Sequence, residues 1–447
     1  MIRVSLLSVA AVLAFAAGTA PSAFAKDGVY TSTTLGRNGD VTVQTTITNG
    51  RIADVKVLDW SETHPIADLP RVKVPADIVK NQSLGVDVVS GATLTSFAII
   101  SGVRDALKQA GLSPADFSKK IAPQPKLTDT VEESADIVII GAGGAGLSAA
   151  VTAAKAGKSV IVMEKTHYAG GNTSVAGGCY NAADPALEAK QEMSPQRRAS
   201  VDALLAEPVR SKLHGELIQK VKAQLAQYDA KGGKYLFDSV ELHALQSWKA
   251  GDYAGNLDLV YELAKGAPEM QKELAEMGFK WNSGTEQVVG ALWPRSNRAS
   301  NYKSGVGYID TFLNEIKTKH LPVTFIMNTA ASDILMKDGR AAGVIGTAEN
   351  GRTFKVLAKD GVILTTGGFG ANIDMRVKYD TIWDKKIGKG VMTTNVPSIT
   401  GDGIKMAQKV GANLIDMGYI QLFPTTDPYT GATNHAVSLT TGIYLNT

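Results

Sequence analysis

The chain begins its patterned part with short runs of β-branched residues, separated by turn residues, between residues 27 and 112. Polar and apolar positions alternate in these runs, which is typical of half-buried strands. The predicted strands are residues 29–33, 41–47 and 52–57. Asn49-Gly50 is a hairpin signal, and a helical pattern from Leu94 ends at Gly111. Residues 26–112 are therefore predicted to form a small α+β domain.

A different pattern follows a proline-containing stretch. Residues 113–134 combine Pro114, Pro123 and Pro125 with serine, lysine and aspartate, which predicts a linker. Beyond it, short continuous apolar runs alternate with helical patterns, as in a parallel sheet whose strands are buried on both faces. The predicted fold class is α/β with a Rossmann-like domain, preceded by the small α+β domain.

The apolar run 136–140 leads directly into a glycine-rich turn and then a helix that ends near Gly157. The turn reads Gly141-Ala142-Gly143-Gly144-Ala145-Gly146. Gly141 permits a tight turn, Gly143 lets the backbone approach a pyrophosphate, and Gly146 permits close packing of helix on strand. A diphosphate is then expected at the positive N-terminal end of the helix.

A second apolar run, 159–163, places Glu164 where an acid can accept hydrogen bonds from ribose hydroxyls. A structural glycine-rich turn is the alternative, but strand, turn, helix, strand and acid occur in the order of a dinucleotide site. The glycine-rich loop 167–178 favours FAD over NAD, because a flat flavin needs backbone donors and few side chains. Two further glycine clusters, 365–370 and 400–403, fit either this site or ordinary helix caps.

Charge and cysteine content exclude several functions. A formal net charge of +3 over 447 residues, with no basic run interleaved with aromatics, gives no sign of nucleic-acid binding. Cys179 is the only cysteine, which excludes an internal disulfide, C-x-x-C-H haem attachment and a cysteine-held iron–sulfur cluster. Organic cofactors are therefore expected to carry any electrons.

Residues 1–25 have the pattern of a signal peptide. Arg3 precedes the apolar run 6–17, and Ala23-Phe24-Ala25 matches a cleavage site. The expected location is periplasmic or secreted, with no membrane span after cleavage, since no other run approaches about 20 apolar residues. An uncleaved anchor is the alternative.

From Asp136 onward the chain resembles the flavoprotein subunits of fumarate reductases, most closely the soluble periplasmic branch. The matching stretches are residues 141–146, Glu164-Lys165, 170–173, 181–183, 366–372 and 400–403. On this resemblance the FAD domain spans 135–418 and a capping domain starts at 419–447. The resemblance implies FAD contacts at Glu164, Lys165, Gly171, Asn172, Thr173, Gly177, Gly178 and Asp402. The loop 172–178 lacks the histidine that tethers FAD in membrane-bound relatives, so we expect non-covalent FAD.

The N-terminal domain resembles FMN-binding domains in which a threonine is esterified to the FMN phosphate. The matching motif is residues 87–93, which opens the predicted helix. Covalent FMN is therefore expected on Thr93, where a phosphate would meet free N–H groups at a helix start. The alternative is that Ser90, Thr93 and Thr95 are plain helix caps.

The two domains together are similar to urocanate reductase. By resemblance, FMN relays electrons from an external donor, such as a quinol-linked cytochrome, to FAD, which reduces the C=C bond of an enoate. A flavin transferase is implied as the partner that attaches FMN. Fumarate reductase and a two-flavin electron carrier are the alternatives. A 3-ketosteroid-type dehydrogenase also shares the FAD fold, but the export signal and FMN module disfavour it.

The chain departs from the family near its end. Phe423-Pro424-Thr425 replaces a His-Pro-Thr motif, which favours a planar ring over fumarate unless Phe423 is only a core residue. Thr425 and His435 are further candidates for the substrate pocket, although a solvent-facing His435 is an equal alternative. By resemblance, the family's catalytic arginine would lie beyond Thr447, the last residue of the sequence. We therefore predict a fragment that does not turn over enoates, and no residue up to Thr447 is assigned as the catalytic acid.

A basic cluster near Trp293 is the last candidate feature. Arg295, Arg298 and Lys303 could face an electron donor or an acidic substrate. A solvated surface is the favoured interpretation, because charge clusters are usually solvated.

Overall fold

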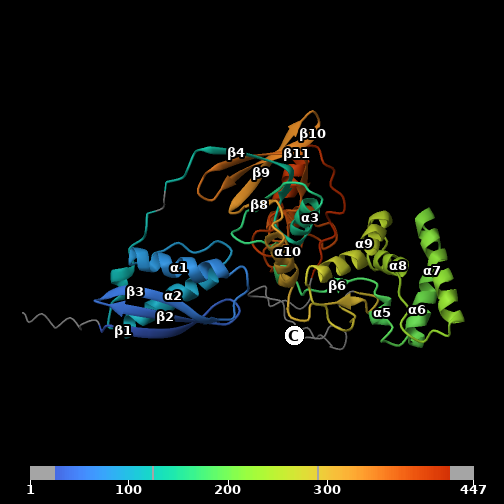
Figure 1. Ribbon diagram of the computed structural model, residues 1–447, viewed down its shortest axis with the longest axis horizontal. Coiled ribbons are helices and arrows are strands. Elements are labelled where there is room, and N and C mark those ends of the chain that lie inside the picture. Colours follow the sequence, from blue (N-terminus) through green and yellow to red (C-terminus); the bar gives the residue numbers. More distant parts are fainter. Residues whose placement is uncertain (1–25, 123–124, 289–290, 423–447) are drawn as a thin grey trace, which may run out of the picture. The chain divides into compact units, whose positions relative to one another are not determined.

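The computed structural model describes residues 26–122, 125–288 and 291–422 (Figure 1). The chain divides into two compact units, one of residues 1–62 and 69–122, the other of residues 63–68 and 123–447. The predicted signal peptide and the candidates Phe423, Thr425 and His435 lie outside the described residues.

Unit 1 contains a three-stranded antiparallel sheet in the order β1-β2-β3. Its elements are β1 (Gly28–Leu35), β2 (Asp40–Thr48), β3 (Arg51–Trp60), α1 (Asp68–Asn81), α2 (Thr93–Gln109) and the short 3₁₀ helix η1 (Pro114–Phe117). Helix α2 packs against β1 and β2. Alternation in β2 directs Val41, Val43 and Ile47 into this core. The predicted strands and helix are confirmed, whereas α1 was missed because Pro70 and Pro75 obscure its pattern.

Unit 2 contains a six-stranded mixed sheet in the order β8-β5-β4-β11-β10-β9. The strands are β4 (Thr130–Ile140), β5 (Val160–Met163), β8 (Val323–Ile326), β9 (Thr329–Lys337), β10 (Arg340–Ala348) and β11 (Thr353–Leu364). The first four in spatial order are parallel, and β11, β10 and β9 pair antiparallel. The α/β class is confirmed. Strand β4 begins at Thr130, inside the stretch predicted as a linker, because residues 130–134 pair with β11.

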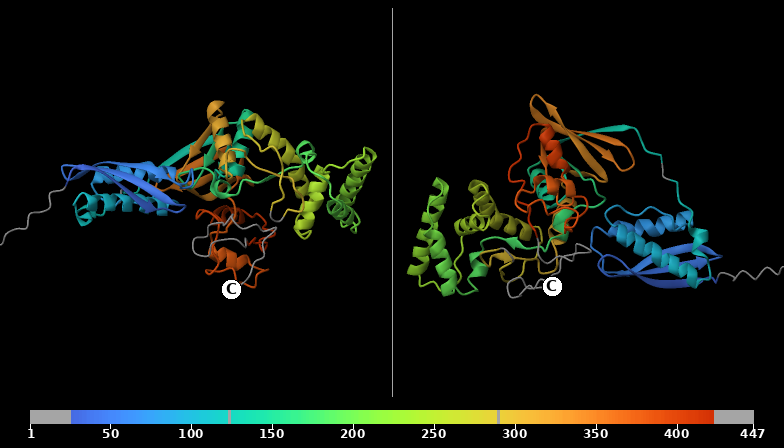
Figure 2. Two further views of the ribbon diagram at one scale, coloured as in Figure 1. Left: turned by 90° about the horizontal axis from the view of Figure 1, so that it is seen from below. Right: turned by 180° about the vertical axis from the view of Figure 1, so that it is seen from behind.

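Helices pack on both faces of the sheet of unit 2 (Figure 2). Helix α3 (Gly144–Lys155) packs against α10 (Val306–Thr318), and their core includes Leu147, Ile309 and Phe312. Helix α12 (Asp402–Lys409) packs against β9, and Met406 joins a second core cluster with Val138. The strands therefore have apolar side chains on both faces, as a buried parallel sheet requires.

A separate helical core lies between β5 and β8 in the sequence and was not predicted. It contains α6 (Pro195–Leu205), α7 (Lys212–Ala230), α8 (Val240–Ala250) and α9 (Leu257–Glu276). Each begins at a side chain whose oxygen accepts backbone N–H groups: Ser194, Ser211, Ser239 and Asn256. The short elements of unit 2 are α4 (Gly171–Val175), β6 (Tyr180–Asn181), α5 (Pro185–Glu188), β7 (Ser296–Asn297) and α11 (Ile373–Tyr379).

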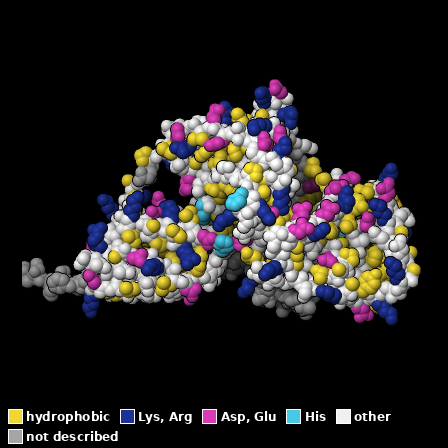
Figure 3. All heavy atoms as spheres, in the orientation of Figure 1, with side chains coloured by type: hydrophobic (Ala, Val, Ile, Leu, Met, Phe, Trp, Pro, Cys, Tyr) yellow, Lys and Arg dark blue, Asp and Glu magenta, His cyan; other side chains and the backbone are white. Residues whose placement is uncertain are grey.

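Acidic and basic side chains are mixed over the face shown in Figure 3. This distribution agrees with the small net charge of +3. Among residues 26–122, 125–288 and 291–422, no helix is long and apolar enough to cross a membrane.

Candidate functional site

A pocket of about 280 Å³ opens where β4, β5 and β11 of unit 2 end. Its lining residues come from segments 140–145, 163–173, 329–331, 364–367 and 398–406. The volume is close to the lower end of the roughly 300–1,000 Å³ that small-molecule sites usually have. The carboxyl ends of parallel strands are where open α/β sheets bind ligands.

The glycine-rich turn forms one wall, and its neighbours hold it in place. Gly141 has φ +103°, and its N–H donates to the Met163 carbonyl at 2.8 Å. A Cβ on Gly146 would lie 1.9 Å from the Gly141 carbonyl oxygen, so only glycine permits this approach of α3 to β4. The predicted roles of Gly141 and Gly146, a tight turn and close helix–strand packing, agree with this geometry.

The start of α3 faces the pocket, and its N-cap residue has no side chain that could cap it. Gly143 is the N-cap residue and makes no side-chain capping bond, and the atom nearest to a Cβ placed there is the Gly170 carbonyl oxygen at 3.8 Å. Gly143, Gly144 and Ala145 all line the pocket. Thr173 Oγ1 accepts the Gly144 N–H, and the remaining N–H groups at the positive end of this 12-residue helix suit a phosphate group. These residues therefore fit the diphosphate of a dinucleotide.

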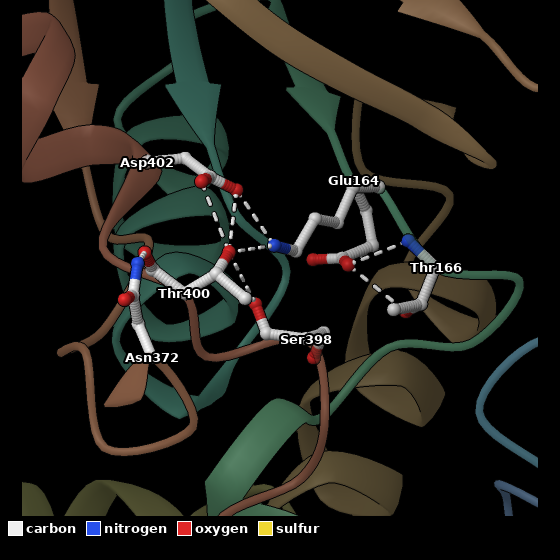
Figure 4. Close-up of polar contacts among 7 residues, drawn as sticks. Glu164, Thr166, Asn372, Ser398, Thr400 and Asp402 are labelled. Atoms are coloured by element: carbon white, nitrogen blue, oxygen red, sulfur yellow. Dashed lines mark hydrogen bonds and ion pairs between the residues drawn. The ribbon is translucent and has the colours of Figure 1, made fainter. Parts of the chain in front are cut away.

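Glu164 braces the turn from the end of β5 (Figure 4). Its Oε2 accepts the Ala142 N–H at 2.8 Å, and its Oε1 accepts the N–H and the hydroxyl of Thr166, both at 2.9 Å. A carboxylate offers about four acceptor positions. One position at Oε2 therefore remains for a ligand hydroxyl, and the predicted ribose contact stays a prediction.

Lys165, Thr400 and Asp402 form a polar group in the pocket wall, and Figure 4 shows Thr400 and Asp402 across from Glu164. The Lys165 Nζ donates to Asp402 Oδ2 at 2.7 Å and to Thr400 Oγ1 at 2.8 Å. The Thr400 hydroxyl in turn donates to Asp402 at 2.9 Å. Burial by itself raises the pKa of Asp402, but the bond and charge of Lys165 lower it below its usual value. Asp402 is therefore an ionised acceptor at the start of α12.

The loop from Gly170 to Thr173 closes the same pocket. The Gly170 N–H donates to the Ala142 carbonyl at 2.8 Å, and Thr173 Oγ1 accepts the Gly144 N–H at 3.2 Å. Gly171 and Asn172 line the pocket beside them. The structure thus brings together nearly all of the predicted FAD residues.

Gly146, Gly177 and Gly178 are the exceptions, because they are not among the residues lining this pocket. The Gly177 carbonyl accepts a hydrogen bond from Arg298, and the Gly178 carbonyl accepts one from the Tyr308 hydroxyl at 2.8 Å. Their backbone oxygens therefore point to side chains rather than into the cavity. Their predicted contact with FAD stays a prediction.

The later glycine clusters belong to the pocket. Thr366 and Gly367 line it after β11, and Thr400 and Asp402 line it at α12. The capping alternative is also correct in part, since Gly401, with φ +77°, is the N-cap of α12. Thr329 and Ala331 of β9 line the pocket as well. Sequence reasoning missed them because the antiparallel strands that carry them were not predicted.

The basic cluster near Trp293 was interpreted incorrectly for Arg295. Its side chain is only 5% exposed and donates to both oxygens of Asp238, at 2.8 Å each. It also donates to Gln246 Oε1 at 2.6 Å. Burial and the charge of Arg295 lower the pKa of the adjacent His243 to about 4. Arg295 is therefore a buried structural cation, and neither a solvated surface nor a donor-facing patch describes it.

Thr93 is exposed at the first turn of α2 in unit 1. The N-cap residue is Ala92, with no side-chain capping bond, so the alternative that these hydroxyls are plain caps is wrong. The Thr95 hydroxyl donates to Glu62, and the Ser96 hydroxyl donates to the Ala92 carbonyl at 3.0 Å. The Thr93 side chain therefore lies at an uncapped start of a 17-residue helix, which suits an attached phosphate.

Protein-family models match both domains of the chain. The model of the FMN-binding domain matches residues 36–108, and that of the FAD binding domain matches residues 136–231 and 225–446. The chain belongs to the FAD-binding family. The resemblance inferred from the motifs is confirmed, and both an FAD-binding and an FMN-binding domain are present. These domains make the chain a member of a family of flavin-dependent oxidoreductases.

Two curated relatives match both domains. The chain is 37% identical over 421 residues to NADH:acrylate oxidoreductase of Vibrio harveyi, covering 91% of this chain and 41% of the relative. It is 32% identical over 413 residues to urocanate reductase of Eggerthella lenta, covering 90% of this chain and 59% of the relative. The chain thus spans about half the length of these proteins.

One solved structure shows the fold. The open conformation of a flavocytochrome c3 fumarate reductase aligns with a TM-score of 0.51 and 24% identity, over 69% of this chain and 45% of that one. At this identity the likeness establishes the architecture, a fumarate reductase-like flavoprotein fold, and nothing about the substrate.

Proposed function

We propose that this protein is a reductase that transfers a hydride to the C=C bond of an α,β-unsaturated carboxylate. The observation that carries the proposal is the pocket of unit 2, where the glycine-rich turn, Glu164 and Asp402 meet. The substrate class is supported by the relatives, which are named as acrylate and urocanate reductases. Bound FAD would supply the hydride, and bound FMN would supply electrons taken from an external donor.

The residues of unit 2 have distinct tasks in holding FAD without a covalent bond. The start of α3 at Gly143 would bind the diphosphate, and Glu164 would accept from the adenosine ribose. Asp402, kept ionised by Lys165, would accept from a hydroxyl of the ligand. Few side chains project from the glycine segments, so a flat ring system can lie against the backbone.

Thr93 would carry FMN covalently, placed there by a flavin transferase. Its exposure gives another enzyme access to the hydroxyl, which a buried threonine such as Thr95 would not allow. The signal-peptide pattern of residues 1–25 supports a location in the periplasm or outside the cell, where an electron-donor protein can reach FMN.

The substrate we propose is a monocarboxylate with a planar or small tail, urocanate first and acrylate next. Phe423 stands where the family has a histidine, and a phenyl ring cannot hydrogen-bond the second carboxylate of fumarate. Acrylate is the second candidate because the 37%-identical relative is named for it. Fumarate and a pure electron-carrier role are the outcomes that the assay must separate.

The test is oxidation of reduced methyl viologen by the full-length protein in the presence of urocanate, acrylate or fumarate. We expect kcat/KM for urocanate or acrylate to exceed that for fumarate at least about tenfold. A preference for fumarate contradicts the substrate assignment, and no oxidation by any enoate supports the electron carrier. Native protein that stays colourless after incubation with FAD overturns the whole proposal.

A further inference from the structure

The side chain of Asn172, which lines the pocket, is held by a segment more than two hundred residues later. Its Nδ2 donates to Asn395 Oδ1 at 2.5 Å, and its Oδ1 accepts the Val396 N–H at 3.0 Å. Asn172 is therefore joined to residues 395 and 396 through both ends of its amide. Those residues lead directly into the pocket wall that contains Ser398.

Asn395 is itself oriented by a neighbour. Its Nδ2 donates to Thr393 Oγ1 at 2.8 Å, and its backbone N–H donates to the same oxygen at 3.1 Å. The amide nitrogen is thus directed to Thr393 and the amide oxygen to Asn172. A side chain held by hydrogen bonds at both ends of its amide can couple the position of the loop that contains Asn172 to that of the wall that contains Ser398.

A third segment, at Gly370, leaves the space that the Asn395 amide occupies. A Cβ on Gly370 would lie 2.3 Å from Asn395 Nδ2, 2.6 Å from Cγ and 2.8 Å from Oδ1. These are the three nearest atoms, and all belong to Asn395. Gly370 has no left-handed φ, so space occupied by Asn395, and not backbone conformation, excludes a side chain here.

We propose that Asn395 is a positioning residue for FAD, and the proposal rests on FAD binding in the pocket of unit 2. Asn395 connects the loop that contains Asn172, the turn that contains Gly370, and the wall that begins at Ser398. It sets the separation of the two walls between which the cofactor lies. Asn395 itself does not line the pocket, which is why no pocket motif revealed it.

The experiment is a double-mutant cycle on FAD affinity. Asn395→Ala removes the amide, Gly370→Ala displaces it, and the double variant combines both changes. We expect each single variant to raise the Kd of FAD about two- to tenfold, since each loses one or two hydrogen bonds. In the Asn395→Ala background, Gly370→Ala should add less than about twofold, because the clashing amide is gone.

Two readouts separate positioning from a general structural role. The FAD midpoint potential and the visible circular dichroism of bound flavin should change in the single variants, whereas thermal unfolding of the apoprotein should change little. Asn301→Ala, at an exposed asparagine, and Gly266→Ala, where a Cβ would meet no atom within 4 Å, are the matched controls. Both should leave the Kd of FAD unchanged.

An unchanged Kd and flavin spectrum in Asn395→Ala overturns the proposal, as does a full additional effect of Gly370→Ala in the double variant. If Asn395→Ala does not fold, Gly370→Ala in the otherwise native chain still tests the proposal, because it displaces the amide without removing it. Wild-type protein that does not bind FAD refutes the proposed function before any variant is compared.

Discussion

The helices α2 of unit 1 and α3 of unit 2 start in similar ways but in different surroundings. Both follow a turn of small residues, and neither N-cap residue makes a side-chain capping bond. Thr93 at the start of α2 is exposed, whereas Gly143 at the start of α3 lines a pocket built from five segments. A cofactor at an exposed phosphate site makes few contacts with the protein, so a covalent bond suits this site. An enclosed site can retain a cofactor by contacts alone.

The two units also differ in the polar groups that they bury. The buried polar residues described in unit 1 are uncharged: Ser32, Thr45, Ser83, Thr95 and Ser96. Unit 2 buries ionisable side chains, including Glu188, Asp238 and Arg295. Because buried ionisable groups link folding to proton binding, the stability of unit 2 should respond to pH more strongly than that of unit 1.

The largest expected effect concerns the tether. Thr93→Ala should abolish the mass increase of one FMN residue when the protein is produced with a flavin transferase, because the acceptor hydroxyl is gone. Mass spectrometry of the peptide that contains residue 93 measures this directly. Ser90→Ala is the matched control, since Ser90 is another exposed hydroxyl of the same motif. A retained FMN in Thr93→Ala, or its loss in Ser90→Ala, would place the tether elsewhere.

A smaller effect is expected at the enclosed site. Gly146→Ala places a Cβ 1.9 Å from the Gly141 carbonyl, so α3 must move away from the turn. Overpacking of this kind costs about 1–3 kcal/mol, and we expect the Kd of FAD to rise about tenfold to a hundredfold. Flavin fluorescence titration is the measurement. FMN attachment at Thr93 should remain, and unaltered FAD affinity would contradict the turn geometry.

Gly266→Ala is the control for that substitution. It changes a glycine within helix α9 where no atom lies within 4 Å of the new Cβ. We expect normal FAD affinity and a gain in stability of about 0.5–1 kcal/mol, because alanine loses less backbone entropy in a helix.

The last prediction tests the difference in buried charge between the two units. Burial, and next the negative charge of Asp238, raise the pKa of Glu188 above its ordinary value of 4.5. The stabilising contribution of the protonated form is fully present below pH 4.5 and is lost as pH rises toward the folded-state pKa. Glu188→Gln does not ionise, so its free energy of unfolding relative to wild type should increase with pH, by at most about 1.4 kcal/mol per pH unit.

Hydrogen exchange between pH 5.5 and 8.5 resolves this effect by unit. Amides of α8 should gain protection in Glu188→Gln as pH rises, and amides of α2 should not change. Glu262→Gln is the control, because the Glu262 side chain is 68% exposed. An α8 response that is flat with pH would show that Glu188 titrates normally.

The comparison also shows which parts of the molecule were predictable. The strands of unit 1 and the segment β4–turn–α3–β5 of unit 2 could be predicted from local patterns. Alternating apolar positions indicate a strand buried on one face, and continuous apolar runs indicate a strand buried on both faces. Helix α1, with two prolines, and the helices α6 to α9 were missed. Helices α6 to α9 pack against one another, so their apolar positions indicate a core only once the arrangement of these helices is known.

The sequence by itself determined the cofactor class, because glycines at positions 141, 143 and 146 and an acid at position 164 meet local requirements of a phosphate-binding turn. Only the tertiary structure decided that Arg295 is buried against Asp238, that Thr329 reaches the pocket, and that Asn395 occupies the space beside Gly370. A backbone turn is specified by neighbouring residues, whereas a side-chain contact depends on where distant segments of the chain are brought together.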